Sequence, residues 1–196
     1  MNIRLKKDYF FNTGLVYDNE FFVNSYALTI DLLTQTEDPD EQNIAYQRIN
    51  FWISSVLNHS ILISEKSKSR KVYEALEQKL ILLPREPVDQ VLCEILFCKL
   101  NAICEKRCEV TQVGLSSSFG DDIVFLHSNL ETFGALDCPG WWTSAKPIWQ
   151  EVPKTKRGNK VIALNFQPEW ADSEVDLDWK TKDTALSAKI FEFPKK

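Results

Sequence analysis

The sequence predicts one α+β domain, with two or three helices on one face of an antiparallel or mixed sheet in a ferredoxin-like arrangement, followed by a β-rich C-terminal extension. Two long segments carry apolar residues at helical spacing, β-branched and aromatic runs flank them, and a Gly-Asp-Asp triplet interrupts an alternating pattern near residue 120. Because these strand-like runs do not alternate regularly with helices, we expect the helices to be segregated to one face of the sheet.

The first expected strand covers residues 21–35, "FFVNSYALTIDLLTQ", as one long strand or two short ones. A helix should follow over residues 39–58. Asp38 can accept hydrogen bonds from free amides at its start, and Pro39 suits the first helical position. Glu41, three residues after Asp38, completes the spacing of a capping box.

The middle of the chain predicts a shorter helix, a strand and a core helix. Apolar residues over 72–80 suggest the short helix, and "LILLP" over 80–84 favours a strand. The next helix opens at Glu86 and Pro87. Its apolar positions up to Ile103 cover more than half of its circumference, which is typical of a helix buried on several sides.

The last third divides the chain into a core and an extension. Residues 109–126 predict a hairpin whose turn contains Gly120, because glycine and aspartate are good turn formers. We expect a core domain over residues 1–129, an aromatic-rich β extension packed on it over 130–179, and a loosely ordered tail over 180–196.

Composition narrows the function classes. A formal charge of −5 argues against a surface that binds nucleic acid all over, since neutralising phosphates needs an excess of Lys and Arg. The N-terminus lacks the pattern of a secretory signal, and no apolar stretch is long enough to span a membrane. Five cysteines, an odd number, fit a reducing compartment, so we expect a cytoplasmic protein without membrane partners.

The Gly-Asp-Asp triplet raises an enzymatic alternative. In palm-type phosphoryl-transfer enzymes, a strand aspartate and a hairpin aspartate pair hold divalent cations, and Asp31, Asp121 and Asp122 occur in a compatible order here. No glycine-rich phosphate-binding segment accompanies them. The structural interpretation, with the two hairpin aspartates at a water-exposed turn, is preferred, and no catalytic residue is assigned.

A zinc site could be drawn from Cys104, Cys108, His127 and Cys138. The chain has no close Cys-x2-Cys pair, so no metal or other cofactor is expected. Cysteines on the long apolar helix are better interpreted as small buried residues, namely Cys93, Cys98 and Cys104.

The most distinctive composition is in the last third, where tryptophans lie close to basic residues. The leading hypothesis is a non-enzymatic interaction protein, such as a small subunit, adaptor or inhibitor, whose partner is a protein. The alternative partner is single-stranded nucleic acid, whose bases stack on aromatic rings. The candidate contact residues are Trp141, Trp142, Trp149, Lys154, Lys156, Arg157, Lys160, Trp170 and Trp179.

Overall fold

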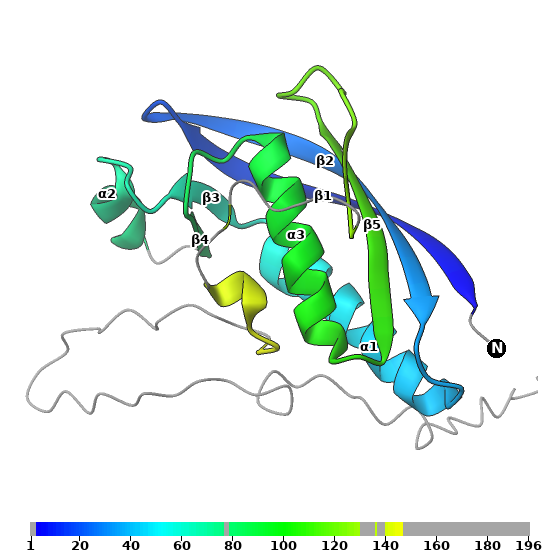
Figure 1. Cartoon of the computed structure of the whole chain (residues 1–196). Helices are drawn as coiled ribbons and strands as arrows, with labels where there is room; N and C mark the ends of the chain where they lie inside the picture. The colour runs from blue at the N-terminus through cyan, green and yellow to red at the C-terminus, as the bar shows by residue number, and fades with distance from the viewer. Residues whose placement is uncertain (1–2, 77–78, 130–135, 137–139, 147–196) are drawn as a thin grey trace, which may run out of the picture.

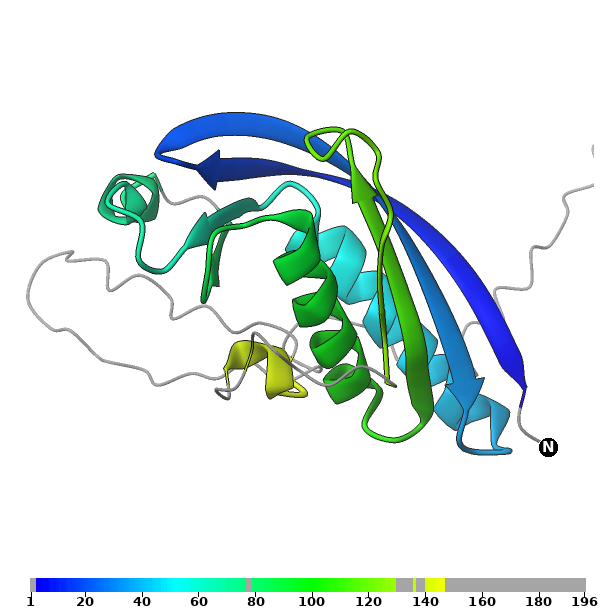
Figure 2. The same cartoon turned by 45° about the horizontal axis from the view of Figure 1, so that its top comes forward.

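The computed structural model of the chain describes residues 3–76, 79–129, 136 and 140–146. These residues form a mixed α+β structure in which a curved sheet wraps around two longer helices (Figure 1). Turning the molecule shows both helices, α1 (Pro39–Phe51) and α3 (Asp89–Cys104), on the concave side of the sheet (Figure 2). The predicted α+β class is confirmed, with these two helices on one face, whereas Tyr73 in the short helix α2 (Arg70–Glu74) packs on the other face beside Val16 and Ile63.

The described residues contribute six strands to the sheet, in the order β4-β3-β1-β2-β5-β6. Pairing is antiparallel from β1 through β2 and β5 to β6, and parallel from β1 through β3 to β4. The strands are β1 (Arg4–Tyr17), β2 (Glu20–Thr34), β3 (Ile61–Ser64), β4 (Leu80–Leu83), β5 (Cys108–Ser117) and β6 (Phe125–Ser128).

This strand order does not confirm the ferredoxin-like arrangement, in which a helix separates the first two strands. Here β1 and β2 form a long hairpin, joined at Asp18 and Asn19, which both have positive φ. Two such residues are typical of a tight turn that follows the twist of the strands. The pattern of residues 21–35 predicts β2, whereas β1 was not predicted.

Alternation along the β1–β2 hairpin divides the sheet into a core face and an opposite face. On the core face, Phe11 and Tyr26 are buried and stack with ring centroids 4.9 Å apart. Leu28 and Ile30 follow on the same face, each at most 1% exposed. This side of the hairpin packs on the helices because side chains two residues apart in a strand point the same way.

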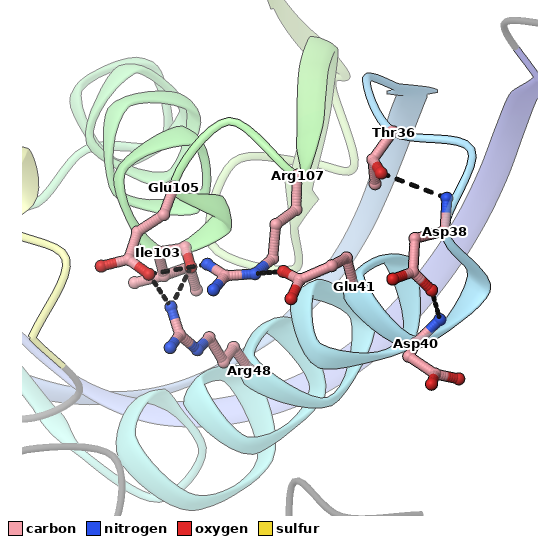
Figure 3. Close-up of polar contacts among 8 residues, drawn as sticks. All are labelled: Thr36, Asp38, Asp40, Glu41, Arg48, Ile103, Glu105 and Arg107. Carbon is pink, nitrogen blue, oxygen red and sulfur yellow. Dashed lines mark hydrogen bonds and ion pairs between the residues drawn. The ribbon is translucent and has the colours of Figure 1, made fainter.

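The first helix is confirmed over nearly its predicted length: α1 (Pro39–Phe51) continues as a π-helical turn, η1 (Trp52–Leu57). Asp38 is the N-cap and accepts a 2.9 Å hydrogen bond from the backbone N–H of Asp40. The other half of the predicted capping box, a hydrogen bond from the N–H of Asp38 to Glu41, is absent between these two described residues. The N–H of Asp38 donates to Thr36 Oγ1, and Glu41 instead pairs with Arg107 (Figure 3).

The predicted core helix is α3 (Asp89–Cys104), in which eleven residues are buried. It begins at Asp89 rather than Glu86, because Val88 is still extended at its N-cap. The short helix α2 (Arg70–Glu74) overlaps only the start of the predicted 72–80 segment and ends at its C-cap Ala75, whereas the strand β4 occurs where the sequence predicts it. No helix among the described residues is long and apolar enough to cross a membrane.

Beyond residue 129 the structure describes Leu136 and residues 140–146 only. They include a 3-10 helix, η2 (Trp141–Thr143), which packs on α3. The predicted strands within 147–179 and the tail over 180–196 lie outside the described residues.

Candidate functional site

The three candidate metal-binding aspartates are not brought together. Ser117, where the hairpin turn begins, pairs with Tyr26, and Asp31 lies five residues further along β2. Five residues of extended strand span about 16 Å. Carboxylates that share a cation lie within about 5 Å of each other, since each oxygen is about 2.0–2.6 Å from the ion. Asp31 therefore cannot complete a site with Asp121 and Asp122 in this structure.

The hairpin over residues 108–128 is confirmed, with a connection from Ser118 to Val124. Asp121 and Asp122 are exposed and have φ values of 52° and 57°, in the left-handed region. Aspartate tolerates this conformation better than most residues. The geometry is that of a strand reversal, as the structural interpretation predicted.

Two buried side chains that the sequence did not single out hold this turn. Asn24 Oδ1, fully buried, accepts 2.9 Å hydrogen bonds from Ser118 Oγ and from the N–H of Phe119. Asp89 Oδ2 accepts a 2.6 Å hydrogen bond from Ser117 Oγ. A polar residue in the middle of an otherwise alternating strand was the available signal for Asn24.

The cysteines are structural in the described part of the chain. Cys93, Cys104 and Cys108 are buried, and Cys98 is half-buried. Burial, and then the neighbouring Cys108, raise the pKa of Cys104 to about 12 despite the positive charges of two arginines. Among the described residues, no group of three or more His, Cys, Asp or Glu could hold a metal ion. Cys138 lies outside them.

The two candidate contact tryptophans that the structure describes pack on the domain itself. Trp142 is 6% exposed, and the indole N–H of Trp141 donates a 2.9 Å hydrogen bond to the carbonyl of Leu82 in β4. Trp141 also stacks on Trp52, with ring centroids 6.0 Å apart. The remaining candidate contact residues, Trp149, Lys154, Lys156, Arg157, Lys160, Trp170 and Trp179, lie outside the described residues.

A lysine that the sequence analysis missed lies next to the rings of Trp52 and Trp141. Lys99 on α3 is fully buried, and its amine donates to the carbonyl oxygens of Ser144 and Lys146, at 2.7 Å each. Burial lowers the pKa of Lys99 to about 7. The signal in the sequence was one positive charge on the buried side of an apolar helix.

The sheet face opposite α1 and α3 carries exposed apolar side chains. Phe10 is 81% exposed and Val23 is 78% exposed. They lie on the same face, because Phe10 pairs with Ala27, and Val23 pairs with Gly14 four residues further along β1. We call this surface the uncovered face; its members on β1, β2 and β6 include Asp8, Phe10, Asn12, Gly14, Val23, Ser25, Ala27, Thr29 and Leu126.

A shallow groove of about 350 Å³ hollows the uncovered face where β1 meets β3. The ring of Phe21 lies over Gly14, where a Cβ would come within 2.6 Å of it. His59 also lines the groove, and its backbone N–H donates to the carbonyl of Asn12 at 2.7 Å. The groove therefore presents apolar and aromatic surface beside an amide and an imidazole.

No protein-family model matches the sequence, and no curated protein matches it significantly. Solved structures with a similar course of the chain include an uncharacterised protein from Wolinella succinogenes, at 12% identity and a TM-score of 0.47, covering 66% of this chain and 99% of that one. A 6-pyruvoyltetrahydropterin synthase variant from Plasmodium vivax shares 10% identity, with 65% and 97% covered and a TM-score of 0.42. The corresponding synthase from Plasmodium falciparum has a TM-score of 0.37 at 10% identity, with 65% and 96% covered. Such values do not transfer an activity to this chain.

Proposed function

We propose that the protein is a non-enzymatic interaction protein, a small subunit, adaptor or inhibitor of a larger assembly, and that the uncovered face is part of its contact surface. The exposure of Phe10 and Val23 on that face carries the proposal. Exposed apolar side chains that gather on one face favour a protein contact, whereas single ones scattered over a surface need no explanation.

The groove supplies a place for an anchor residue of the partner. Interfaces gain most of their binding energy from a few side chains that enter well-packed pockets near their centre. Phe21 and Val23 line the groove, and Asn12 and His59, which also line it, provide polar groups. This combination suits an apolar or aromatic side chain flanked by hydrogen-bonding backbone.

The charged, tryptophan-rich segment beyond residue 146 is the second part of the proposed contact surface, as its composition predicts. Aromatic residues there would anchor the partner, and the surrounding charges would speed its encounter. The separation of Asp31 from Asp121 and Asp122 favours this proposal over metal-dependent phosphoryl transfer.

Photo-crosslinking from the uncovered face tests the proposal. A benzophenone amino acid replaces Phe10 in the full chain, and crosslinks formed in the cells that produce the protein are identified by mass spectrometry. The matched control places the same group at Val72, which is 63% exposed but lies on α2. We expect one protein to be captured from position 10 and not from position 72.

A second variant confirms that the same face binds the captured protein. Val23→Asp should weaken its binding at least tenfold, because a charge replaces an apolar contact, whereas Val72→Asp should leave binding unchanged. Equal capture from both positions, crosslinking only to a second copy of this chain, or unaltered binding of Val23→Asp would each overturn the proposal.

A further inference from the structure

The first half of β1 has an edge that no described strand covers. On one side, β1 pairs with β2 along its whole length, from Arg4 to Tyr17. On the other side, it pairs with β3 only from Gly14 to Val16. Figure 2 shows the first half of β1 at the outer margin of the sheet. We call this side of residues 4–10 the open edge.

Hydrogen bonds where β3 begins show which residues of β1 face this edge. The N–H of Asn12 donates to Asn58 Oδ1 at 3.0 Å, and its carbonyl accepts from the N–H of His59 at 2.7 Å. The N–H of Gly14 donates to the carbonyl of Ser60 at 2.8 Å. The N–H and C=O groups of one residue point to the same side of a strand, and every second residue points the same way. The residues whose N–H and C=O groups face the open edge are therefore Arg4, Lys6, Asp8 and Phe10.

On the uncovered face, the open edge begins with two cationic side chains. Arg4 and Lys6 are exposed, and they lie on the same face as Phe10 because side chains alternate along a strand. Asp8 lies between them and Phe10, and its carboxylate accepts a 2.7 Å hydrogen bond from Thr29 Oγ1. Opposite charges on neighbouring strands stabilise a sheet. Arg4 and Lys6 therefore favour acidic side chains on a strand that pairs with this edge.

On the opposite face, the same edge begins with apolar side chains. Ile3 and Leu5 are exposed, and Lys7 follows, with its amine 5.7 Å from the centre of the Tyr9 ring. An added strand with apolar side chains on this face would remove Ile3 and Leu5 from water. The open edge thus suits an extended segment in which acidic and apolar residues alternate.

The chain carries such a segment outside the described residues. Residues 174–179 read "EVDLDW", in which each acid is followed by an apolar residue. In an extended conformation, Glu174, Asp176 and Asp178 would share one face and the apolar residues the other. This pattern with a period of two is typical of a strand that has one face against a core.

We propose that residues 174–179 of this chain pair with the open edge of β1 as a further strand. Their acidic side chains lie beside Arg4 and Lys6, and their apolar side chains lie beside Ile3 and Leu5. The sheet then gains one strand, formed by the chain itself, where its longest hairpin is otherwise open to solvent.

This inference does not depend on the proposed function, because it concerns the protein without a partner. It assigns Trp179 to a contact within the chain, whereas Trp149 and Trp170 remain for a contact with another protein. The added strand lies beside the uncovered face and leaves Phe10 and Val23 exposed on it.

The chain between the described domain and this segment is long enough for the contact. Residues 147–173 can span about 90 Å when extended, whereas a domain of this size is about 35 Å across. A flexible tether keeps the segment at an effective concentration of about 1 mM. A contact with an intrinsic Kd of about 0.1 mM would therefore be formed about 90% of the time.

Amide hydrogen exchange of the full chain, followed residue by residue by NMR, measures whether the open edge is covered. An edge that is paired about 90% of the time exchanges its amides about tenfold more slowly than an unstructured peptide. We expect this protection for the amides of Lys6, Asp8 and Phe10. It should not change when the protein is diluted about tenfold, because the segment belongs to the same chain.

A proline in the segment should remove this protection. Leu177→Pro deletes an N–H and disfavours pairing in the middle of a strand, so the three amides should exchange as fast as in an unstructured peptide. Leu186→Pro, the same replacement in the predicted tail, is the matched control and should leave the protection unchanged. Exchange of the amides of Leu96 and Leu100 on α3 reports whether each variant is folded.

Reversing one charge on each side tests the pairing of the two strands. Lys6→Glu and Asp176→Lys should each reduce the protection of the open edge to about threefold or less, because each places like charges side by side. The double variant restores opposite charges and should recover the protection to within about twofold of the wild type. Lys68→Glu, in the exposed loop before α2, is the matched control and should leave the protection unchanged.

Fast exchange at all three open-edge amides of the wild type would refute the proposal whether or not the variants fold. Protection that survives Leu177→Pro would mean that another part of the chain covers the edge, and protection lost on dilution would mean that a second copy does. Either result would also refute the proposal, as would a double charge variant that is no better protected than its two parents. None of these results bears on whether the uncovered face binds another protein, so the proposed function is tested separately.

Discussion

The carboxylate of Asp89, the first residue of α3, accepts a 2.6 Å hydrogen bond from the hydroxyl of Ser117, the last residue of β5. Both side chains are buried. Ser117 Oγ in turn accepts from the N–H of Gly120 at 3.1 Å, and a Cβ at Gly120 would overlap the Asp89 carboxylate. The start of the core helix and the turn of the hairpin therefore fix each other.

Two replacements of Asp89 distinguish the contribution of its hydrogen bond to stability from the cost of burying its charge. Asp89→Ala should lower the free energy of unfolding by about 1–3 kcal/mol, because it leaves the buried Ser117 hydroxyl without its acceptor. Asp89→Asn keeps an acceptor oxygen and removes the cost of burying a charge, so it should stay within about 1 kcal/mol of the wild type. Urea denaturation at neutral pH measures both; equal losses would contradict the role of the hydrogen bond.

The difference in stability between the wild type and Asp89→Asn should depend on pH. Burial raises the pKa of Asp89, an effect that the hydrogen bond from Ser117 opposes only in part. The folded state thus holds the proton more tightly than the unfolded chain, so the contribution of Asp89 to stability is present at acid pH and lost as the pH rises through the raised pKa. Relative to Asp89→Asn, the wild type should be less stable at about pH 7 than at about pH 4.

The exposed turn residues can be tested through their backbone conformation. Asp121 has φ of 52°, which glycine adopts freely and a β-branched residue adopts poorly. Asp121→Gly should change the free energy of unfolding by no more than about 0.5 kcal/mol, whereas Asp121→Val should cost about 1–2 kcal/mol. Thermal unfolding measures both changes in stability.

The same turn should not bind a metal ion. Titration calorimetry with Mn²⁺ should show no binding to the wild type; binding that Asp121→Gly abolishes would restore the metal-site interpretation.

Much of the fold could be predicted because hydrophobic periodicity decides it. α3 is recognisable from apolar positions that cover more than half of its circumference, and the β5–β6 hairpin from its Gly-Asp-Asp turn. β1 escaped prediction because its first half, Arg4–Phe10, is almost fully exposed and carries four charges, so alternation between apolar and polar residues is absent there. Its pairing partner β2, rather than its own composition, makes it a strand.

The contact surface was harder to predict, because composition shows which residues are aromatic but not which way they point. Composition predicts Trp142 as a contact residue, whereas in the structure its side chain packs into the core beside α3. Composition does not distinguish Phe10 and Val23 as contact residues, although the β1–β2 register places both on the uncovered face. Lys99 could have been questioned from sequence, since a lone charge on a buried helix needs partners, but those partners are backbone carbonyls 42 to 47 residues away.

The buried cysteines should resist alkylation in the native protein. Burial, followed by the neighbouring Cys108, raises the pKa of Cys104 to about 12, and the thiolate is the reactive form. Iodoacetamide at about pH 8 should therefore modify Cys93, Cys104 and Cys108 at least about a hundredfold more slowly than in urea, where thiols have a pKa near 8.5. Peptide mass spectrometry resolves each site. Fast native labelling of Cys104 would mean that the end of α3 opens readily.

The Arg48 side chain connects α1 to the end of α3. Its replacement should show how much this connection contributes to the free energy of unfolding. It pairs with Glu105 and donates to the carbonyl of Ile103, one of the last carbonyls of the helix (Figure 3). Its side chain is 10% exposed. Arg48→Met should lower the free energy of unfolding by about 1–3 kcal/mol, because it removes a donor from that carbonyl and leaves Glu105 paired with Arg107 alone.

The Arg70–Glu74 pair is the matched control, since both side chains are about 40% exposed and four residues apart on α2. Arg70→Met should lower the free energy of unfolding by less than about 0.5 kcal/mol, because exposed ion pairs contribute little to stability.

Burial raises the pKa of Glu105, but hydrogen bonds from Arg48 and Arg107 outweigh this effect and leave the pKa lowered. The contribution of Glu105 is therefore present above its ordinary pKa and lost as the pH falls through the lowered one. The difference in stability between wild type and Arg48→Met should accordingly shrink in acid, and a constant difference from about pH 7 down to about pH 2 would show that Arg48 acts through packing alone.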